Sequence, residues 1–298
     1  MIRIGIDLGG TNIAVGTVDD GHAIVSRVSV PTLARRPAAE VVGDMGDAVE
    51  AALAKAGLSI GDCCSIGIGS PERAYNLGWD HVPVCRMLEE RFHVPCRLSN
   101  DANCAALAEQ VAGAAVGHDN VVLITLGTGV GGGIIIGGKI YDGMRGAGAE
   151  LGHTLLVLDG EPCTCGRRGC WEAYSSATAL IRQARQAAAE HPESLLAGAE
   201  EITGKTVFDA ADRGDETANA VVDRFCDYLG AGVTNIVNAL APEVILIGGG
   251  ISRQGERLLA PVRRYVEKNC FGGKDGAIPI IAAARLGNDA GIIGAAAL

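Results

Sequence analysis

The feature that most constrains the fold of this chain is a Gly-rich strand–turn–strand pattern that occurs twice. The first copy is IGIDLGGTNIAVGTVDDGHAIV, residues 4–25, and the second is LITLGTGVGGGIIIGGKIYDG, residues 123–143. In each copy a glycine-rich turn separates two apolar runs, and a second turn follows them, at 19–21 and at 137–138. Internal similarity of this kind is typical of duplicated structural units. The pattern predicts two related lobes facing one ligand, with chance similarity between Gly-rich strands as the alternative.

Apolar runs alternate with helical patterns along the whole chain. Strands are expected at residues 1–8, 13–19, 65–70, 96–99, 120–127, 132–138 and 243–248. Helices are expected at residues 36–57, with Gly57 as the C-terminal stop, at 101–115, from about 171, and at 216–240. This alternation is typical of an α/β protein. We expect an N-terminal lobe at 1–117, completed by a C-terminal helix at 287–298, and a second lobe at 118–286.

Length, charge and the first residues exclude several classes of protein. At 298 residues the chain is near the size at which one core gives way to two. Its net charge of -10 argues against a nucleic-acid partner held through its phosphates. No run approaches the roughly eighteen apolar residues that span a membrane, and MIRIGIDLGG is not a secretory signal. We therefore expect a cytoplasmic protein whose ten cysteines are reduced thiols.

The two Gly-rich turns, DLGGTN at 7–12 and LGTGVGGG at 126–133, have the chemistry of an anion-binding site. Residues without a Cβ let backbone N–H groups approach an anion closely. Neither turn has the spacing of a dinucleotide fingerprint or of a P-loop. Either one alone is also explained as a structural turn, but one in each lobe favours a triphosphate with its hydrated Mg²⁺. The candidate residues are Asp7, Gly9, Gly10, Thr11, Asn12, Thr128 and Gly129.

A third glycine cluster follows the apolar run EVILIG. Gly248, Gly249 and Gly250 lie where this predicted strand turns into a helix. Such a turn allows the flat, close contact that a nucleoside requires. A tight turn without a ligand explains the glycines equally well.

The segment LSNDAN at 98–103 places two polar residues where a strand ends and a helix begins. Asn100 and Asp101 both suit an N-cap, which is the structural explanation. A carboxylate at this position is also favoured by the helix dipole and is available to accept a hydroxyl proton during phosphoryl transfer.

The segment CTCGRRGCWE at 163–172 contains three cysteines in eight positions. Together with His153 of the preceding AELGH, Cys163, Cys165 and Cys170 make the Cys₃His set of a closed structural zinc site. A metal-free reduced loop is the alternative, and a disulfide is disfavoured in a reducing compartment.

In order along the chain, DLGGTN, LSNDANCAALAE, LITLGTGVGGGIIIGGKIYDGMRGAGAELGH, CTCGRRGCWE and PEVILIGGGIS resemble the motifs of the ROK family of bacterial sugar kinases and repressors. The resemblance extends from residue 2 to LGNDAGIIGAA near the C-terminus. It implies an actin-like, hexokinase-type (ribonuclease H-like) two-lobed α/β fold with a mixed sheet in each lobe, closing around a hexose and ATP, and a homodimer or homotetramer. It also implies that Asp101 is the catalytic base, that the sugar contacts are Asn100, Asp101, Glu150, His153 and Glu172, and that a structural Zn²⁺ is held by His153, Cys163, Cys165 and Cys170.

Within this family the chain is most similar to glucokinases, notably at NLGW, residues 76–79. It departs from the family after 69–71, where only four residues, 72–75, precede NLGW and the family has a longer loop. That loop would border the sugar, so its shortening bears on sugar affinity and specificity.

The function that the resemblance implies is ATP-dependent phosphorylation of glucose at its 6-hydroxyl. The alternatives are a kinase for N-acetylglucosamine, N-acetylmannosamine, allose or fructose, and a weakly active sugar-binding protein. A repressor of the family would need an N-terminal winged helix-turn-helix, whereas the first predicted phosphate strand is under way by residue 4. We expect neither nucleic-acid nor membrane partners.

Overall fold

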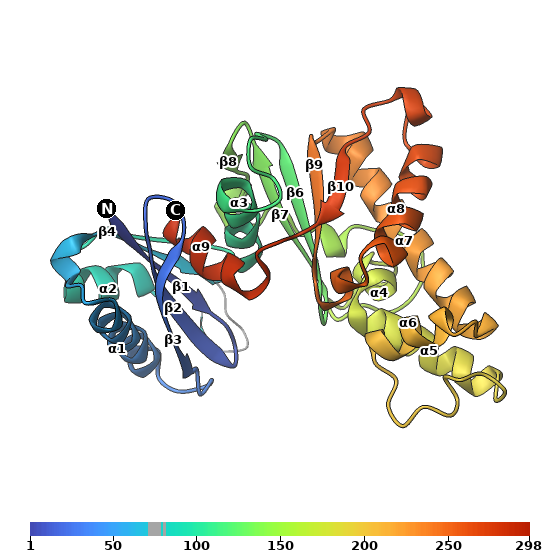
Figure 1. The fold of residues 1–298 in the computed structure, drawn as a ribbon, viewed down its shortest axis with the longest axis horizontal. Helices are drawn as coiled ribbons and strands as arrows, with labels where there is room; N and C mark the ends of the chain where they lie inside the picture. The colour runs from blue at the N-terminus through green and yellow to red at the C-terminus, as the bar shows by residue number, and fades with distance from the viewer. Residues whose placement is uncertain (71–78, 80–81) are drawn as a thin grey trace. The chain divides into compact units, whose positions relative to one another are not determined.

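The structure is a computed structural model that describes residues 1–70, 79 and 82–298. It contains two five-stranded mixed sheets with helices packed on them (Figure 1). The first sheet has the strand order β3-β2-β1-β4-β5, and the second has the order β10-β9-β6-β7-β8. If the strands of each sheet are renumbered in chain order and the second sheet is read from β8 to β10, both sheets have the order 3-2-1-4-5. The repeated sequence pattern therefore corresponds to a repeated strand topology.

The first sheet is built from the first Gly-rich hairpin and two later strands. Its strands are β1 (Ile2–Leu8), β2 (Asn12–Val18), β3 (Ile24–Pro31), β4 (Cys63–Gly69) and β5 (Cys96–Ser99). The hairpins β1–β2 and β2–β3 are antiparallel, whereas β4 is parallel to β1 and β5 is parallel to β4. Because parallel strands end at the same edge, the last residues of β1, β4 and β5 meet there. Asp7 and the segment 100–101 lie at this edge.

Helices cover both faces of the first sheet. They are α1 (Ala38–Ala56), α2 (Val84–Phe92), α3 (Asp101–Ala112) and α9 (Ala290–Ala296). Figure 1 shows α1 on one face of the sheet and α9 on the other. Alternation along β1 explains the two faces, since Ile4 and Ile6 join the core with α1 while Gly5 faces α9. A Cβ on Gly5 would lie 1.9 Å from the carbonyl oxygen of Ile292, so only glycine admits this close packing.

The second sheet contains the second Gly-rich hairpin. Its strands are β6 (Val121–Leu126), β7 (Val130–Ile136), β8 (Lys139–Ile140), β9 (Val244–Gly249) and β10 (Ile280–Ala283). The remaining helices are α4 (Glu172–Ser175), α5 (Ala177–Glu190), α6 (Gly204–Asp212), α7 (Glu216–Leu240) and α8 (Glu256–Asn269). Strand β9 is parallel to both β6 and β10 and is buried from Val244 to Gly248.

The chain divides into two compact units. The first unit consists of residues 1–119, 133–148 and 285–298, and the second of residues 120–132 and 149–284. The division passes through β7 and assigns residues 133–148 to the first unit. Within the described ranges, no helix has both the length and the apolar character needed to cross a bilayer.

Most predicted elements have the expected residues. Helix α7 spans 216–240 as predicted, and α1 ends at Gly57 in the left-handed conformation with φ 69°. The helix expected from about residue 171 is interrupted: α4 ends at Ser175, and Ser176 is extended and caps α5 through its side chain.

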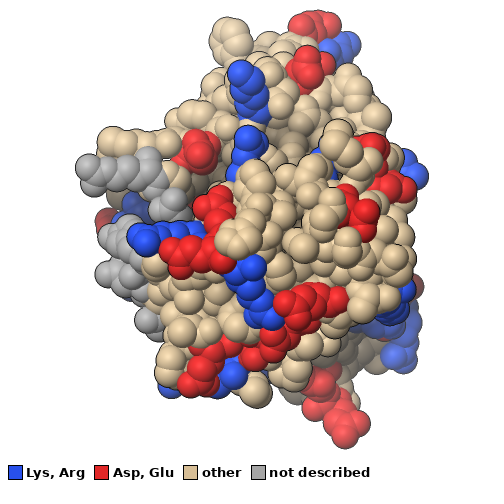
Figure 2. Space-filling model, turned by 90° about the vertical axis from the view of Figure 1, so that its left-hand side faces the viewer, with Lys and Arg blue, Asp and Glu red and all other residues tan. Residues whose placement is uncertain are grey.

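Basic and acidic side chains are interspersed on the face shown in Figure 2. Arg91 pairs with Asp47 at 2.7 Å and with Glu50 at 2.8 Å, and Arg36 pairs with Asp44 at 2.5 Å. The Arg91 pairs join α2 to α1, and the Arg36 pair joins α1 to the segment before it. In each pair a positive side chain lies beside a negative one.

Candidate active site

In the first unit, the first Gly-rich turn is a tight connection between β1 and β2. The Gly9 N–H donates to the carbonyl of Asn12 at 3.0 Å, and the Thr32 hydroxyl donates to the carbonyl of Gly9 at 2.7 Å. The segment 10–12 at the tip is exposed to solvent. The turn is therefore fixed by the hydrogen bond from Thr32, while its tip is exposed to solvent, where an anion could bind.

Asp7 lies on β1 just before this turn and is half-buried. Burial raises the pKa of its carboxyl above the usual 3.8, and the negative charge of Asp101 raises it further. A Cβ on Gly291 would lie 2.5 Å from the Asp7 carboxylate, so α9 approaches it closely. Asp7 and Asp101 thus form a pair of acidic groups within the first unit, and such a pair favours a nearby cation.

Asn100 and Asp101 divide the roles that the sequence left open at this position. The Asn100 Oδ1 accepts the Ala102 N–H at 2.8 Å and is the N-cap of α3. Asp101 is the first residue of the helix, and its side chain is exposed. The Asp101 Oδ1 also accepts the Ala102 N–H, at 2.9 Å, so both side chains contact the helix start, and the exposed Asp101 is in addition accessible to a substrate hydroxyl.

In the second unit, Glu172 joins the second Gly-rich turn to the cysteine loop. Its Oε2 accepts the Val130 N–H at 3.0 Å, and its Oε1 accepts the Thr164 hydroxyl at 3.0 Å. A Cβ on Gly129 would lie 2.1 Å from Oε2, so the carboxylate needs a glycine there. One predicted sugar contact thus ties a predicted phosphate-binding turn to the predicted metal-binding loop. Thr128, beside these residues, is exposed.

The four predicted metal ligands lie together. One ligand atom from each of His153, Cys163, Cys165 and Cys170 falls within 4.8 Å of every other. The Cys163 Sγ is 3.6 Å from the His153 Nδ1, and the Cys165 Sγ is 3.6 Å from the Cys170 Sγ. A tetrahedral zinc with bonds of about 2.0–2.3 Å separates its ligand atoms by roughly 3.3–3.8 Å. The cluster therefore fits a tetrahedral Zn²⁺.

The protein surroundings favour deprotonation of one ligand. Hydrogen bonds from Arg167, first from its backbone N–H, lower the pKa of Cys165 to about 6. Burial raises the pKa of Cys170 to about 12, so a metal would have to displace its proton. The Arg167 guanidinium also donates to the carbonyl of His153 at 2.5 Å, which joins the two ends of the site.

The glycines after β9 occupy the expected strand end. Gly249 has φ 87°, and a Cβ there would lie 2.2 Å from the carbonyl oxygen of Leu126 on β6. Gly250 begins a short 3₁₀ helix, 250–254, and is exposed, whereas Gly248 still pairs with Thr125. The close approach to β6 explains Gly249 structurally, and Gly250 has open space beside it.

Two predicted features stand apart from these contacts. Glu150 is exposed beside the 3₁₀ turn Leu151–His153, and its carbonyl accepts the His153 N–H at 3.1 Å. The shortened loop, 72–75, falls outside the described residues. The contact of Thr164 with Glu172 was not predicted, although the position of Thr164 between two predicted ligand cysteines could have indicated a role for it.

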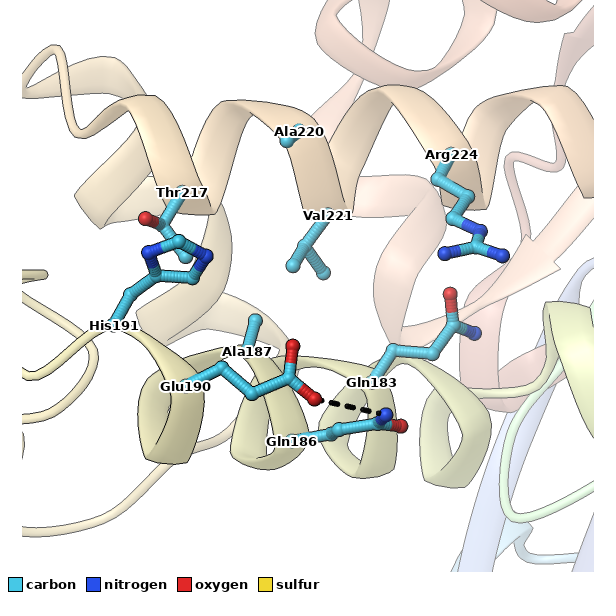
Figure 3. Close-up of a pocket in the computed structure, with 9 residues that line it drawn as sticks. All are labelled: Gln183, Gln186, Ala187, Glu190, His191, Thr217, Ala220, Val221 and Arg224. Atoms are coloured by element: carbon cyan, nitrogen blue, oxygen red, sulfur yellow. Dashed lines mark hydrogen bonds between the residues drawn. The ribbon is translucent and has the colours of Figure 1, made fainter.

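A separate hollow lies between α5 and α7 (Figure 3). It has a volume of about 230 Å³ and is lined by Gln183, Gln186, Glu190, His191, Thr217 and Arg224, among others. None of the predicted site residues lines it.

The chain is similar over nearly its whole length to known glucokinases and a hexokinase. A glucokinase of Halalkalibacterium halodurans is 41% identical, with 98% of this chain and 92% of that protein covered. A ROK family glucokinase of Streptomyces griseus, solved in complex with glucose and AMPPNP, is 38% identical with a TM-score of 0.80, over 100% of this chain and 98% of the other. The ROK hexokinase of Thermus thermophilus is 35% identical with a TM-score of 0.83, over 99% and 97%.

The fold that the resemblance implied is confirmed by these structures. The model of the ROK family matches residues 3–298, nearly the entire sequence. Glucokinases at this level of identity align with the chain from end to end, so no large part of the fold is left unmatched. The chain belongs to the ROK family.

Proposed function

We propose that this protein is an ATP-dependent glucokinase that phosphorylates the 6-hydroxyl of glucose. The observation that carries the proposal is the full-length similarity to a ROK glucokinase solved with glucose and a non-hydrolysable ATP analogue. The two sets of site residues agree with it, because each unit presents one Gly-rich turn and at least one exposed or hydrogen-bonded carboxylate.

Asp101 is the proposed catalytic base. Phosphoryl transfer needs a group that orients the attacking hydroxyl and accepts its proton, while most of the remaining barrier is lowered by positioning and by charge stabilisation. Asp101 is exposed at the start of α3, and Asn100 already caps the helix. The Asp101 Oδ1 shares the Ala102 N–H with Asn100, so Asp101 is not the sole cap of the helix, and its exposed carboxylate can reach a substrate hydroxyl.

The two Gly-rich turns and Asp7 are the proposed phosphate and Mg²⁺ contacts. The exposed tip of the first turn and the exposed Thr128 offer N–H and hydroxyl donors to phosphate oxygens. Mg²⁺ would offset the charge on the phosphates when ATP is bound, and Asp7 is the residue proposed to hold its hydration shell. Gly248, Gly249 and Gly250 are the proposed contacts for the nucleoside.

Glu150, His153 and Glu172 are the proposed sugar contacts of the second unit. The Nδ1 of His153 faces the cysteine thiols, so its other ring nitrogen remains for a sugar hydroxyl. Zn²⁺ held by His153 and the three cysteines would keep this ring in place and would fix its tautomer. The zinc is thus proposed as a structural ion with no part in the chemical step.

Turnover with a panel of hexoses tests the proposal. ADP formation is measured with ATP and Mg²⁺ for glucose, N-acetylglucosamine, N-acetylmannosamine, allose and fructose, with inorganic polyphosphate as a second donor. We expect the highest kcat/KM for glucose with ATP. A higher value for another hexose would reassign the substrate. Measurable glucose binding without turnover of any hexose would show a sugar-binding protein and would reject the kinase.

A further inference from the structure

Two cysteines outside the metal cluster, Cys85 and Cys96, line the same cavity in the first unit. Cys85 is in the first turn of α2, and Cys96 is the first residue of β5. Both line one cavity of about 490 Å³, whose other walls include Trp79, Val82 and Leu98. Both are partly exposed, whereas Cys104 and Cys226 are buried.

The connection between the two elements is short and already restrained. Helix α2 ends at His93, which has φ 55°, and β5 begins three residues later. The Glu89 Oε1 accepts the Cys96 N–H at 2.9 Å. Glu89 lies one helical turn after Cys85 on the same face of α2, so Cys85 faces the start of β5. A disulfide between Cys85 and Cys96 would join α2 to β5, which are already held together by the hydrogen bond of Glu89.

The two thiols differ in acidity. A hydrogen bond from Cys96 lowers the pKa of Cys85, and the same contact raises the pKa of Cys96. By contrast, burial raises the pKa of Cys63 to about 11 and that of Cys104 to about 12. Cys85 also lies at a helix N-terminus, where the dipole favours a thiolate. Cys85 therefore has the character of an attacking thiol and Cys96 that of a resolving thiol.

We propose that Cys85 and Cys96 are a peroxide-sensitive dithiol that closes reversibly into a disulfide. The Cys85 thiolate attacks hydrogen peroxide, an S–O bond forms as the O–O bond breaks, and the released hydroxide takes a proton to become water. Cys96 then attacks the Cys85 sulfur, an S–S bond forms as the S–O bond breaks, and the second hydroxide leaves as water with the Cys96 proton. Two thiols lose two electrons, and one peroxide becomes two waters.

The position of the pair connects this modification to the proposed active site. Strand β5 ends at Ser99, directly before the cap Asn100 and the proposed base Asp101. A disulfide at the first residue of β5 would restrain the strand that carries the base. This consequence for activity rests on the proposed function, whereas the dithiol itself does not.

Peptide mapping of zinc-loaded, reduced protein treated with hydrogen peroxide tests the dithiol. Trypsin cleaves after Arg86, Arg91 and Arg97, so Cys85 and Cys96 fall on separate peptides. We expect a linked pair of these peptides, lost on reduction with dithiothreitol. In Cys96→Ser the reaction should stop at a Cys85 sulfenic acid that dimedone traps. Cys64→Ser, which removes a partly exposed thiol elsewhere in the sheet, should still form the link.

If Cys85 and Cys96 can still be alkylated, and are therefore still free thiols, at peroxide concentrations that oxidise Cys64, the proposal is overturned. Activity is a second readout: peroxide should lower the kcat of the wild type several-fold and reversibly, and should leave that of Cys96→Ser unchanged while zinc content stays constant. Full turnover in the linked wild type would reject the effect on activity. If the proposed function is wrong, the reduced protein will show no turnover before any oxidation. The linked peptides will then still show whether Cys85 and Cys96 form a disulfide.

Discussion

Asp101 and Asn100 show how neighbouring residues at a helix N-terminus take different tasks. The Asn100 side chain caps α3, and the Asp101 carboxylate is left exposed. Both types suit an N-cap, so the sequence could not say which of them does this. In the structure both accept the Ala102 N–H, at 2.8 Å for Asn100 and 2.9 Å for Asp101, so the helix keeps a cap if Asp101 is replaced.

Replacing Asp101 by Asn should therefore remove activity without unfolding the protein. We expect kcat to fall by about 10²–10⁴-fold, because Asn keeps the size and polarity of the side chain but cannot accept a proton. Steady-state kinetics with glucose and ATP, together with a melting curve, measure this. Glu216→Gln, at the exposed first position of α7, is the matched control and should leave kcat unchanged. Near-normal turnover in Asp101→Asn would mean that another group is the base.

The ionised carboxylate of Asp7 should lower the stability of the folded protein at neutral pH, although the proposed function requires it. Burial and the charge of Asp101 raise its pKa in the folded chain above the 3.8 of the unfolded chain. The folded state is favoured below 3.8, and stability is lost as the pH rises through the raised pKa. Asp7→Asn cannot ionise, so it should melt higher than the wild type at neutral pH, by about 2–4 °C for each 1 kcal/mol recovered.

The pH dependence makes this prediction specific. The difference in Tm between Asp7→Asn and the wild type should grow with pH from about pH 4 and then level off, while turnover falls because Asp7 is a proposed Mg²⁺ and phosphate contact. A difference that is constant from acid to neutral pH would attribute the effect to packing rather than to ionisation.

Among the elements, the start of α4 is positioned by packing against α7. Trp171, directly before α4, is 1% exposed and donates its indole N–H to the carbonyl of Tyr228 at 3.0 Å. A Cβ on Gly232 would lie 2.0 Å from the Trp171 ring. The next residue, Glu172, is held by Val130 and Thr164. A glycine within α7 thus determines where a proposed sugar contact lies.

Gly232→Ala should consequently destabilise the protein, although alanine is the better helix former. We expect a loss of about 1–3 kcal/mol from overpacking against Trp171, and a lower kcat/KM for glucose. Gly43→Ala in α1 is the matched control, since a Cβ there meets nothing within 4 Å. It should add about 0.5–1 kcal/mol. Denaturant unfolding compares the two, and equal effects would contradict the role of the Trp171 contact.

The cysteine loop should depend on its metal. We expect near one zinc per chain in the purified protein, well below one in Cys165→Ser, and loss of thermal stability and turnover on chelation, because metal binding energy contributes to folding of the loop. Metal analysis and melting curves measure this, with Cys64→Ser as a control that keeps its zinc. An active, stable protein without bound metal would contradict the zinc site.

At the scale of the whole molecule, the first unit is assembled from three separate stretches of the chain. Glu109 of α3 is fully buried and links the first of these stretches to the last. Its Oε1 accepts the N–H groups of Arg285 and Leu286 at 2.8 Å each, and its Oε2 accepts the Ala114 N–H at 2.8 Å. The carboxylate therefore anchors the segment by which the chain returns to this unit before α9.

Glu109→Ala should be among the most destabilising single changes in the first unit. It leaves three backbone N–H groups without their acceptor, at a cost of about 3 kcal/mol or more. Glu109→Gln keeps one acceptor oxygen and should be intermediate. Glu90→Ala, which breaks an exposed pair with Arg86, should cost less than about 1 kcal/mol. Denaturant unfolding ranks the three, and hydrogen exchange at 285–286 should rise only in the Glu109 variants.

Local patterns were sufficient to predict much of this protein. The Gly-rich hairpins, the span of α7 and the spacing of Cys163, Cys165 and Cys170 involve residues close in sequence, where turn chemistry and periodicity act directly. The repetition of one hairpin predicted two related lobes, and the two sheets have the same strand order. The break of the helix at Ser176 was missed because a capping side chain overrode the helical pattern.

The sequence by itself determined the α/β class, the family, the duplicated Gly-rich hairpin and the set of candidate ligands, because each depends on short-range spacing. Only the tertiary structure decided that Glu172 binds Val130, that Glu109 binds Arg285 and Leu286, and that Cys85 and Cys96 line one cavity. These contacts join residues distant in the chain or on different elements. They depend on how helices and strands pack, and packing is governed by shape and burial that no local pattern records.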